Sequence, residues 1–253
     1  MPASARPRRE PDLDEGLGTG AGVRASRREE MAAQILEIGR AHLVEHGAAA
    51  LSLRAVARDV GMVSSAVYRY VASRDDLLTL LVVDAYTELA DTVDAALARV
   101  RGGGVERRVL ALARAVRGWA LAHPSRWALL YGSPVPGYQA PDEVTTEPGT
   151  RVMRLLVGLV DAGVASGEVA TGAGRVPVSR ALRCDLAAIR TELGVTHADE
   201  AVLGRAISLW TALLGAVSAE VFGQFGADTF SAPDQVFDHE IRLALVVLVG
   251  PVG

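Results

Sequence analysis

Residues 51–71 read LSLRAVARDVGMVSSAVYRYV, and this stretch decides the fold. Its first half carries four apolar residues at the spacing of one helix face: Leu53, Val56, Ala57 and Val60. Ser52 can cap this helix, and Gly61 ends it. A short helix follows, from about Ser64 to Tyr70, and the side that we expect to pack inward against the first helix carries Val67, with Val71 just beyond. A helix, a glycine-led turn and a second short helix are the order of a helix-turn-helix.

The short helix has side chains suited to DNA. Small residues open it, so that it can lie in the major groove: Ser64, Ser65 and Ala66. Longer side chains follow, with reach and donors for phosphate oxygens or base edges: Tyr68, Arg69 and Tyr70. Arg74, near the start of the next helix, can clamp the DNA backbone. An ordinary helical hairpin with a solvated polar face has the same spacing, so spacing alone leaves both interpretations open.

Helical patterns account for most of the remaining chain. An S-x-x-E capping box at Ser26 starts a first helix that ends at Gly47, and Ser73 starts a fourth that runs to about Arg99. Further apolar helical patterns cover 105–122, 125–131, 150–165, 178–193, 198–225 and 234–248, with a long Pro- and Gly-rich loop over 132–149. Strand-like alternation does not occur. The sequence predicts an all-α fold of two domains that share the long fourth helix.

The predicted organisation has three parts. Residues 1–25 form a disordered arm, rich in Pro, Gly, Arg and acids. Residues 26–74 form the helix-turn-helix domain, and residues 75–253 form a second, helical domain. The arm carries four arginines that could reach a flanking minor groove: Arg6, Arg8, Arg9 and Arg24. The acidic residues within 10–15 weaken this hypothesis.

Composition narrows the function classes. The net charge of the 253-residue chain is −4, yet residues 22–74 hold eight Arg against five acids, an asymmetry found in nucleic-acid-binding modules. The single cysteine, Cys184, excludes an internal disulfide and a cysteine-based zinc site, and we expect neither metal nor cofactor. A membrane span and a signal peptide are not expected either, so we expect a cytoplasmic protein.

Residues 30–80 resemble the N-terminal domain of the TetR/AcrR family of transcriptional regulators. The matching segments are ILEIGRAHLVEHG (35–47) and LSLRAVARDVGMVSSAVYRYVASRDDLL (51–78). The resemblance implies a bacterial regulator, usually a repressor. Such a protein binds a palindromic double-stranded DNA operator as a homodimer and releases it when a small molecule binds the C-terminal domain.

The resemblance also implies roles for individual residues. Ser52 matches a helix start that often touches phosphate, and Tyr68 matches the tyrosine of the family that contacts DNA. The base-facing start of the recognition helix is matched by Ser64, Ser65 and Ala66. Neighbouring phosphate contacts are matched by Arg69 and Tyr70, and the usual lysine of helix four by Arg74. Val63 stands where a Ser or Thr usually caps the N-terminus of the recognition helix. The missing cap lowers the stability by about 1 kcal/mol unless Ser64 takes this role one residue later.

The C-terminal half resembles, more weakly, an effector-domain class with a Trp-His-Gly-like stretch. Here the stretch runs from Trp210 to Gly215 and lacks the His. Bodies of this kind dimerise through their last two long helices, which are matched by about 200–225 and 234–248. The same apolar faces would also suit an intramolecular core.

The effector pocket is expected among the helices of 105–193. Candidate lining residues are Trp119, His123, Trp127, Tyr131, Tyr138, Arg151 and Arg183. Pockets are mostly apolar with a few placed polar groups, so the effector is expected to be partly apolar. Each aromatic residue alone is more often core than ligand contact.

Two alternatives to a DNA-binding regulator stay open, and so does the role of Cys184. The chain could be a dimeric ligand-binding protein without DNA binding, or a helical enzyme that uses His123 or His197, although no nucleophile-base pair or metal spacing supports an enzyme. Cys184 has Arg residues on both sides and could be a redox sensor, but a buried spectator thiol is the more common case.

Overall fold

The computed structural model describes residues 20–172, 176–226 and 228–250. These residues form α-helices and one short 3₁₀ helix and contain no strand, which confirms the all-α prediction. The helices are α1 (Gly20–His46), α2 (Leu53–Asp59), α3 (Ser64–Val67), α4 (Arg74–Arg99), α5 (Val105–Ala122), α6 (Pro124–Tyr131), α7 (Asp142–Ala165), α8 (Arg180–Glu192), α9 (Glu200–Val221) and α10 (Pro233–Val249). The 3₁₀ helix η1 (Ala48–Ala50) joins α1 to α2.

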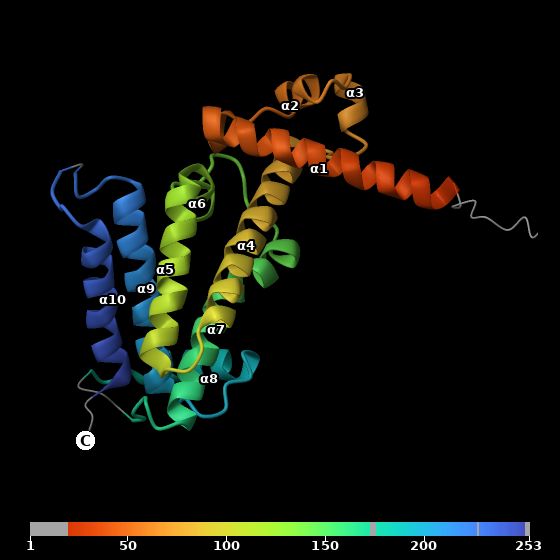
Figure 1. Cartoon of the computed structure of the whole chain (residues 1–253). Coiled ribbons are helices and arrows are strands. Elements are labelled where there is room, and N and C mark those ends of the chain that lie inside the picture. Colours follow the sequence, from red (N-terminus) through yellow and green to blue (C-terminus); the bar gives the residue numbers. More distant parts are fainter. Residues whose placement is uncertain (1–19, 173–175, 227, 251–253) are drawn as a thin grey trace, which may run out of the picture.

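The first three helices and the start of α4 form a small head. Helix α1 lies across the end of α4, and α2 and α3 lie on the side of α1 that faces away from the rest of the chain (Figure 1). The head has its own core of buried side chains: Ile35, Leu51, Leu53, Val56, Ala57, Val67, Val71, Leu77, Leu78 and Leu81. The inward positions predicted for α2 and α3 are therefore confirmed.

Helix α4 belongs to both parts of the molecule. Its first turns supply Leu77, Leu78 and Leu81 to the head core. Its later turns supply Ala85, Leu89, Ala90 and Val93 to a second core. The boundary proposed between residues 74 and 75 therefore falls one residue inside α4, whose first two turns pack in the head.

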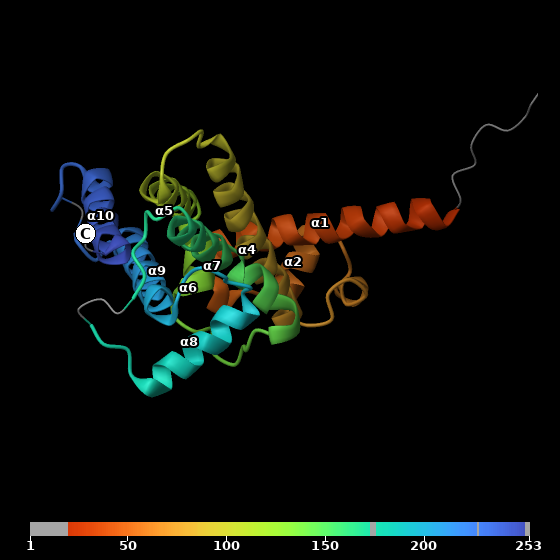
Figure 2. The ribbon, with the colours of Figure 1, turned by 90° about the horizontal axis from the view of Figure 1, so that it is seen from below.

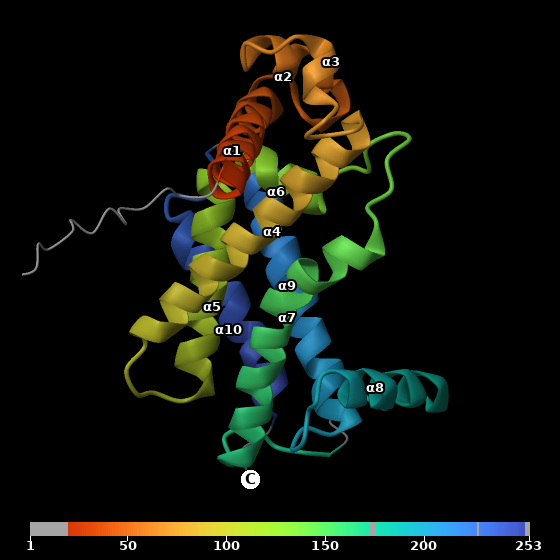
Figure 3. The same ribbon diagram turned by 90° about the vertical axis from the view of Figure 1, so that its right-hand side faces the viewer.

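The remaining helices form the body. Helices α5, α9 and α10 lie side by side, and α7 packs along α4 and α5 (Figure 1). The body core contains large side chains from all of them, among them Trp119, Trp127, Leu156, Leu213 and Phe237. Helix α8 packs mainly on α9 and projects sideways from the base of the body (Figures 2 and 3).

Helix α9 passes a simple test for a membrane-spanning helix by length and composition only. The core helix of a soluble protein passes the same test. Seven side chains of α9 are buried in the body, including Val202, Leu209 and Val217. Helix α9 also has an exposed side, with Ile207, Thr211, Ala212 and Gly215.

Two predicted boundaries were wrong. Helix α1 begins at Gly20, so the last six residues of the expected arm are helical, whereas residues 1–19 lie outside the described residues. Ser26 is thus not a cap, and its hydroxyl donates to Glu30 over 3.4 Å within the helix. Helix α7 begins at Asp142 and runs through Pro148, which shortens the expected loop 132–149 by eight residues. The carboxylates of Asp142 and Glu143 in the first turn favour this earlier start.

Candidate nucleic-acid interface

The turn between α2 and α3 has a defined geometry. Gly61 has a φ of 77°, which a glycine adopts without strain. Its N–H donates to the carbonyl of Arg58 over 3.0 Å, and the N–H of Met62 donates to the carbonyl of Ala57 over 2.9 Å. This pair of bonds is a Schellman motif, which satisfies the last carbonyls of α2. The turn therefore fixes where α3 starts.

Helix α3 is shorter than predicted. It ends at Val67, and the chain continues in turns, with the N–H of Tyr70 donating to the carbonyl of Val67 over 2.8 Å. Val63 is the N-cap residue, and it supplies no side-chain hydrogen bond because a valine side chain has no polar atom. Burial of Val67 in the head core holds this short element in place.

The side chains around α3 divide into inward and outward groups. Ser65 and Arg69 are exposed, and Tyr68 keeps 46% of its surface accessible. Tyr70 is half-buried and packs against the head core, and Ala66 is half-buried. Helix α3, which carries Ser65, lies on the side of the head that faces away from the body (Figure 1).

Ser52 performs its predicted capping role. Its hydroxyl accepts the backbone N–H of Ala55 over 3.4 Å, at the N-terminus of α2. Ser52 is exposed, and so is Arg54 two residues later. Both residues sit at the positive end of the α2 dipole, which favours a nearby anion.

Arg74 is placed differently from the expected phosphate clamp. Its Nε donates to the carbonyl of Leu51 over 3.1 Å, and its Nη2 donates to the carbonyls of Ala48 and Ala49, each over 3.1 Å. Its Nη1 lies 3.4 Å from the carboxylate of Asp75. Four of the five guanidinium N–H groups are thus engaged within the head. Arg74 ties η1 and the start of α2 to the start of α4.

A buried histidine links α1 to α2. The Nε2 of His42 lies 2.7 Å from a carboxylate oxygen of Asp59, and His42 is only 7% exposed. The hydrogen bond from His42, followed by contacts with Arg58, holds the pKa of Asp59 below its ordinary value. No spacing pattern in the sequence indicates this pair, because the two residues lie on different predicted helices.

Models of two consecutive parts of one protein family match this chain. The model described as bacterial regulatory proteins, tetR family, matches residues 35–81. The model described as tetracyclin repressor-like, C-terminal domain, matches residues 109–244. The chain belongs to the TetR family. The finer Trp-His-Gly class stays a prediction, since the C-terminal match carries a different description.

Whole-chain relatives agree with this membership. The HTH-type transcriptional regulator Rv1816 of Mycobacterium tuberculosis H37Rv is 50% identical over 227 residues, which are 90% of this chain and 96% of the relative. The crystal structure of SCO4313 is 34% identical, covers 87% of this chain and 98% of its own, and has a TM-score of 0.68. A tetR-family protein from Rhodococcus RHA1 is 15% identical with a TM-score of 0.59, over 88% of this chain and 98% of its own, and shares the fold. The chain is a DNA-binding transcriptional regulator of the helix-turn-helix type.

The aromatic residues expected in the effector pocket of this TetR-family protein pack together in the body. Trp119 is 4% exposed and donates its indole N–H to Glu88 over 3.2 Å, and Trp127 is fully buried and donates to Ser218 over 3.2 Å. The ring of Tyr131 lies 4.4 Å from that of Trp127, and burial raises the pKa of its hydroxyl. These side chains fill space between helices, and the indole N–H groups of both tryptophans have partners within the body.

The other pocket candidates are dispersed. The hydroxyl of Tyr138 lies 3.0 Å from that of Thr79, where the segment after α6 meets the head. Arg151 pairs with Asp91 over 2.7 Å and also with Asp94. Arg183 is exposed on α8 and donates to the carbonyl of Val178 over 3.2 Å. The structure thus distributes the seven candidates over the body core, the junction with the head and the surface of α8, and their role in effector binding stays a prediction.

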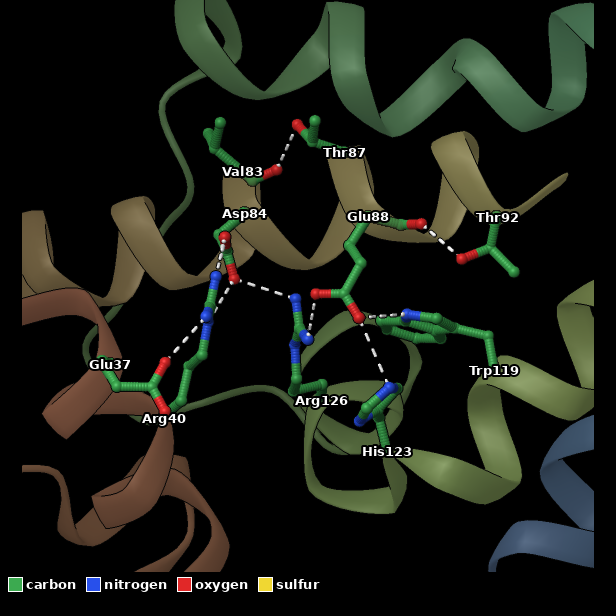
Figure 4. A network of polar contacts seen from close by, with 10 residues as sticks. All are labelled: Glu37, Arg40, Val83, Asp84, Thr87, Glu88, Thr92, Trp119, His123 and Arg126. Carbon is green, nitrogen blue, oxygen red and sulfur yellow. Dashed lines mark hydrogen bonds and ion pairs between the residues drawn. The ribbon is translucent and has the colours of Figure 1, made fainter. Parts of the chain in front are cut away.

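A polar network that sequence reasoning missed connects the head to the body (Figure 4). Arg40 of α1 donates from Nε and Nη2 to the carboxylate of Asp84 on α4, over 2.9 and 2.5 Å. Arg126 of α6 donates to the same carboxylate over 2.8 Å and to Glu88 over 2.6 Å. His123 lies 3.3 Å from Glu88. The network joins three helices, and its residues are too far apart in sequence for any spacing rule.

Burial and charge act in opposite directions on Glu88. Desolvation works to raise its pKa, but the hydrogen bond and charge of Arg126, the hydrogen bond of Trp119 and the charge of His123 outweigh it, and the pKa is lowered. Arg126 itself is only 7% exposed, and its guanidinium lies 5.3 Å from the Trp119 ring centre. A buried arginine between two carboxylates fixes the position of α6 against α4.

Cys184 is exposed on α8, so the expectation of a buried thiol was wrong. His197 is also exposed, and its backbone N–H donates to Asp161 over 2.7 Å. Over the described ranges, no group of three His, Cys, Asp or Glu side chains is arranged to hold a metal ion.

Proposed function

We propose that this TetR-family regulator is a cytoplasmic repressor. It binds a palindromic operator as a homodimer and releases the operator when a small molecule binds. The observation that carries the DNA-binding part is the exposure of Ser65, Tyr68 and Arg69 on α3 and the turn after it. Helix α3 lies on the side of the head that faces away from the body (Figure 1). A short helix with small residues first can enter the major groove, where base edges are distinguishable.

The residues would divide the work by their positions. Ser64, Ser65 and Ala66 open α3 and would face base edges, and Tyr68 would contact a base or phosphate from the following turn. Arg69 is exposed and would bind phosphate. Tyr70 is half-buried, so only its hydroxyl end could reach the DNA backbone.

Two residues would act at the edges of α2 and α4. Ser52 would add a phosphate contact at the N-terminus of α2, where the helix dipole helps. Arg74 would support the interface by positioning η1 and α2 rather than by binding phosphate, because its donors are occupied by carbonyls.

Homodimerisation is proposed through α9 and α10. Helix α10 exposes three apolar side chains, Leu243 (56%), Val246 (70%) and Val247 (58%). Helix α9 exposes Ile207 (37%) and the small residues Thr211 and Gly215. Contiguous exposed apolar surface of this kind is typical of an interface. A palindromic operator needs a paired protein, since each half-site takes one copy.

The test is selection of bound fragments from the source genome at two salt concentrations, with the wild-type protein and Tyr68→Ala in parallel. We expect a shared palindrome that the wild type enriches and the variant does not, with weaker enrichment at the higher salt. Arg58→Ala, an exposed arginine on α2, is a matched control for loss of an exposed side chain from the head. Equal enrichment by wild type and Tyr68→Ala would refute the proposed interface and place DNA contacts elsewhere in the head. No enrichment by either protein would favour a ligand-binding dimer without DNA binding.

A further inference from the structure

A cavity of about 630 Å³ lies where the head meets the body. On one side it is bounded by the end of α1 and by η1, including Leu43, Val44 and Ala48. On the other side it is bounded by α6, the segment after α6 and the end of α9, including Ala128, Leu129 and Phe222. Its volume is in the range of sites for small molecules.

The lining of this junction cavity is uncharged. Aliphatic, aromatic, proline and glycine residues form most of it, and the only side-chain hydroxyls in it belong to Ser125 and Ser133. Two of its apolar side chains are unusually accessible: Val44 is 71% exposed and Phe222 is 42% exposed. Apolar side chains exposed around a concave surface indicate a binding site. A charged ligand would lose its hydration here without finding a counter-charge.

Helix α6 separates the junction cavity from the polar network. Ser125, Ala128 and Leu129 line the cavity. Arg126, from the same helix, holds Asp84 and Glu88 of α4. Asp84 in turn holds Arg40 of α1 (Figure 4). A molecule that pushes α6 away from α1 would therefore act on the only charged network that joins these helices in the described part of the chain.

We propose that the junction cavity binds a small, uncharged and mostly apolar molecule, and that its occupancy changes the position of the head relative to the body. The site differs from the pocket expected in the body, because the seven residues predicted for that pocket do not line it. The effect on DNA rests on the proposed function, whereas binding at the cavity does not.

The direct test is titration of the full-length protein with Nile red, a neutral apolar dye that fluoresces in apolar sites. We expect saturable binding of one dye per chain. Ala128→Phe puts a ring into the cavity from α6 and should weaken dye binding at least tenfold. Ala98→Phe, on an exposed turn of α4 outside the lining, is the matched control and should bind as the wild type does.

A second variant guards against misfolding. Phe222→Ser removes an exposed wall of the cavity and should also weaken dye binding, with a melting temperature close to that of the wild type. Equal dye binding by all four proteins, or no saturable binding by any, would overturn the proposal. Sedimentation of each protein is measured as well. If Ala128→Phe converts a dimer into a monomer, the second copy occupies the cavity and the proposal is wrong.

The link to DNA is tested with the fragment that the genomic selection enriches. We expect the dye to weaken binding of the fragment at least fivefold. Because coupling between two sites is reciprocal, the bound fragment should weaken dye binding by the same factor. Dye binding that is unchanged by a bound fragment would refute the regulatory role of the cavity. Failure to enrich any fragment would refute the proposed function instead, and the dye titration would still decide whether the site exists.

Discussion

Arg74 lies at the start of α4, and most of its guanidinium N–H groups donate hydrogen bonds within the head. Its guanidinium bonds the carbonyls of Ala48, Ala49 and Leu51, which have few other partners in the bend between α1 and α2. We expect Arg74→Ala to lower the free energy of unfolding by about 1–2 kcal/mol, because these carbonyls lose a charged donor. Urea unfolding measures this loss. Arg58→Ala, on the exposed face of α2, should change stability far less.

Arg69 should behave in the opposite way. It is exposed, and no contact with another described side chain fixes it. Arg69→Ala should therefore leave the unfolding free energy within about 0.5 kcal/mol of the wild type. It should reduce the slope of log affinity against log salt by about one, as expected for loss of one phosphate contact. Urea unfolding measures the stability, and fluorescence anisotropy with the selected operator at several salt concentrations measures the salt slope. A salt slope unchanged in Arg69→Ala would remove this residue from the interface.

For single residues, the sequence predicted which side chains are buried in the head, but it did not predict the surroundings of the pocket candidates in the body. Val67 could be placed inward because its neighbours on two helices follow a fixed short-range spacing. Trp127 and Arg126 could not be placed, because their burial depends on α4 and α9, which are far away in the chain. Aromatic residues on a helix indicate burial but not whether a ligand or another helix covers them.

At the scale of elements, apolar periodicity predicted most helices, and the failures have local causes. Helix α7 was predicted to start eight residues late because Pro148 and Gly149 are typical of loops. Pro148 is buried and is the seventh residue of α7, beyond the first turn, so it removes one backbone hydrogen bond and the helix continues in spite of it. Helix α1 was predicted to start late because Ser26 has a capping pattern that the longer helix does not use.

Asp161 of α7 holds the segment that leads into α9. Its carboxylate accepts the backbone N–H groups of His197 and Ala198, each over 2.7 Å, and that of Thr196 over 3.4 Å. Burial works to raise the pKa of Asp161, but these bonds outweigh it and the pKa is lowered. A lowered folded-state pKa stabilises the fold above the unfolded value near 4, and this contribution is lost as the pH falls below it.

Asp161→Asn should therefore cost about 1–2 kcal/mol at pH 7, because the charge-assisted bonds become neutral. The difference from the wild type should shrink as the pH falls from 6 to 3. Urea unfolding across this range measures it, and Asp185→Asn, an exposed aspartate on α8, is the control. A difference that stays constant with pH would show that the charge of Asp161 does not contribute.

At the scale of the whole molecule, the uncovered apolar surface of α9 and α10 is the feature that one chain does not explain. Each helix buries one face in the body core, and α10 still exposes Leu243, Val246 and Val247. The sequence predicted the position of these helices, but it could not show which face remains free. That depends on how α5 and α7 pack behind them.

A charge placed on this face tests the proposed dimer. Val246→Glu should change the stability of the single chain little, because Val246 is 70% exposed. In a dimer the same carboxylate would be desolvated against its symmetry mate, which should weaken self-association by about 2–4 kcal/mol, or roughly 30- to 1,000-fold. Sedimentation should show a dimeric wild type and a largely monomeric variant at micromolar concentration. Operator binding should fall with it, since a lone head reads only one half-site.

Leu182→Glu, on an exposed position of α8 outside the proposed interface, should leave both dimer and operator binding unchanged. A variant at Val246 that remains dimeric would place the interface elsewhere, and loss of the dimer in Leu182→Glu would extend the interface to α8.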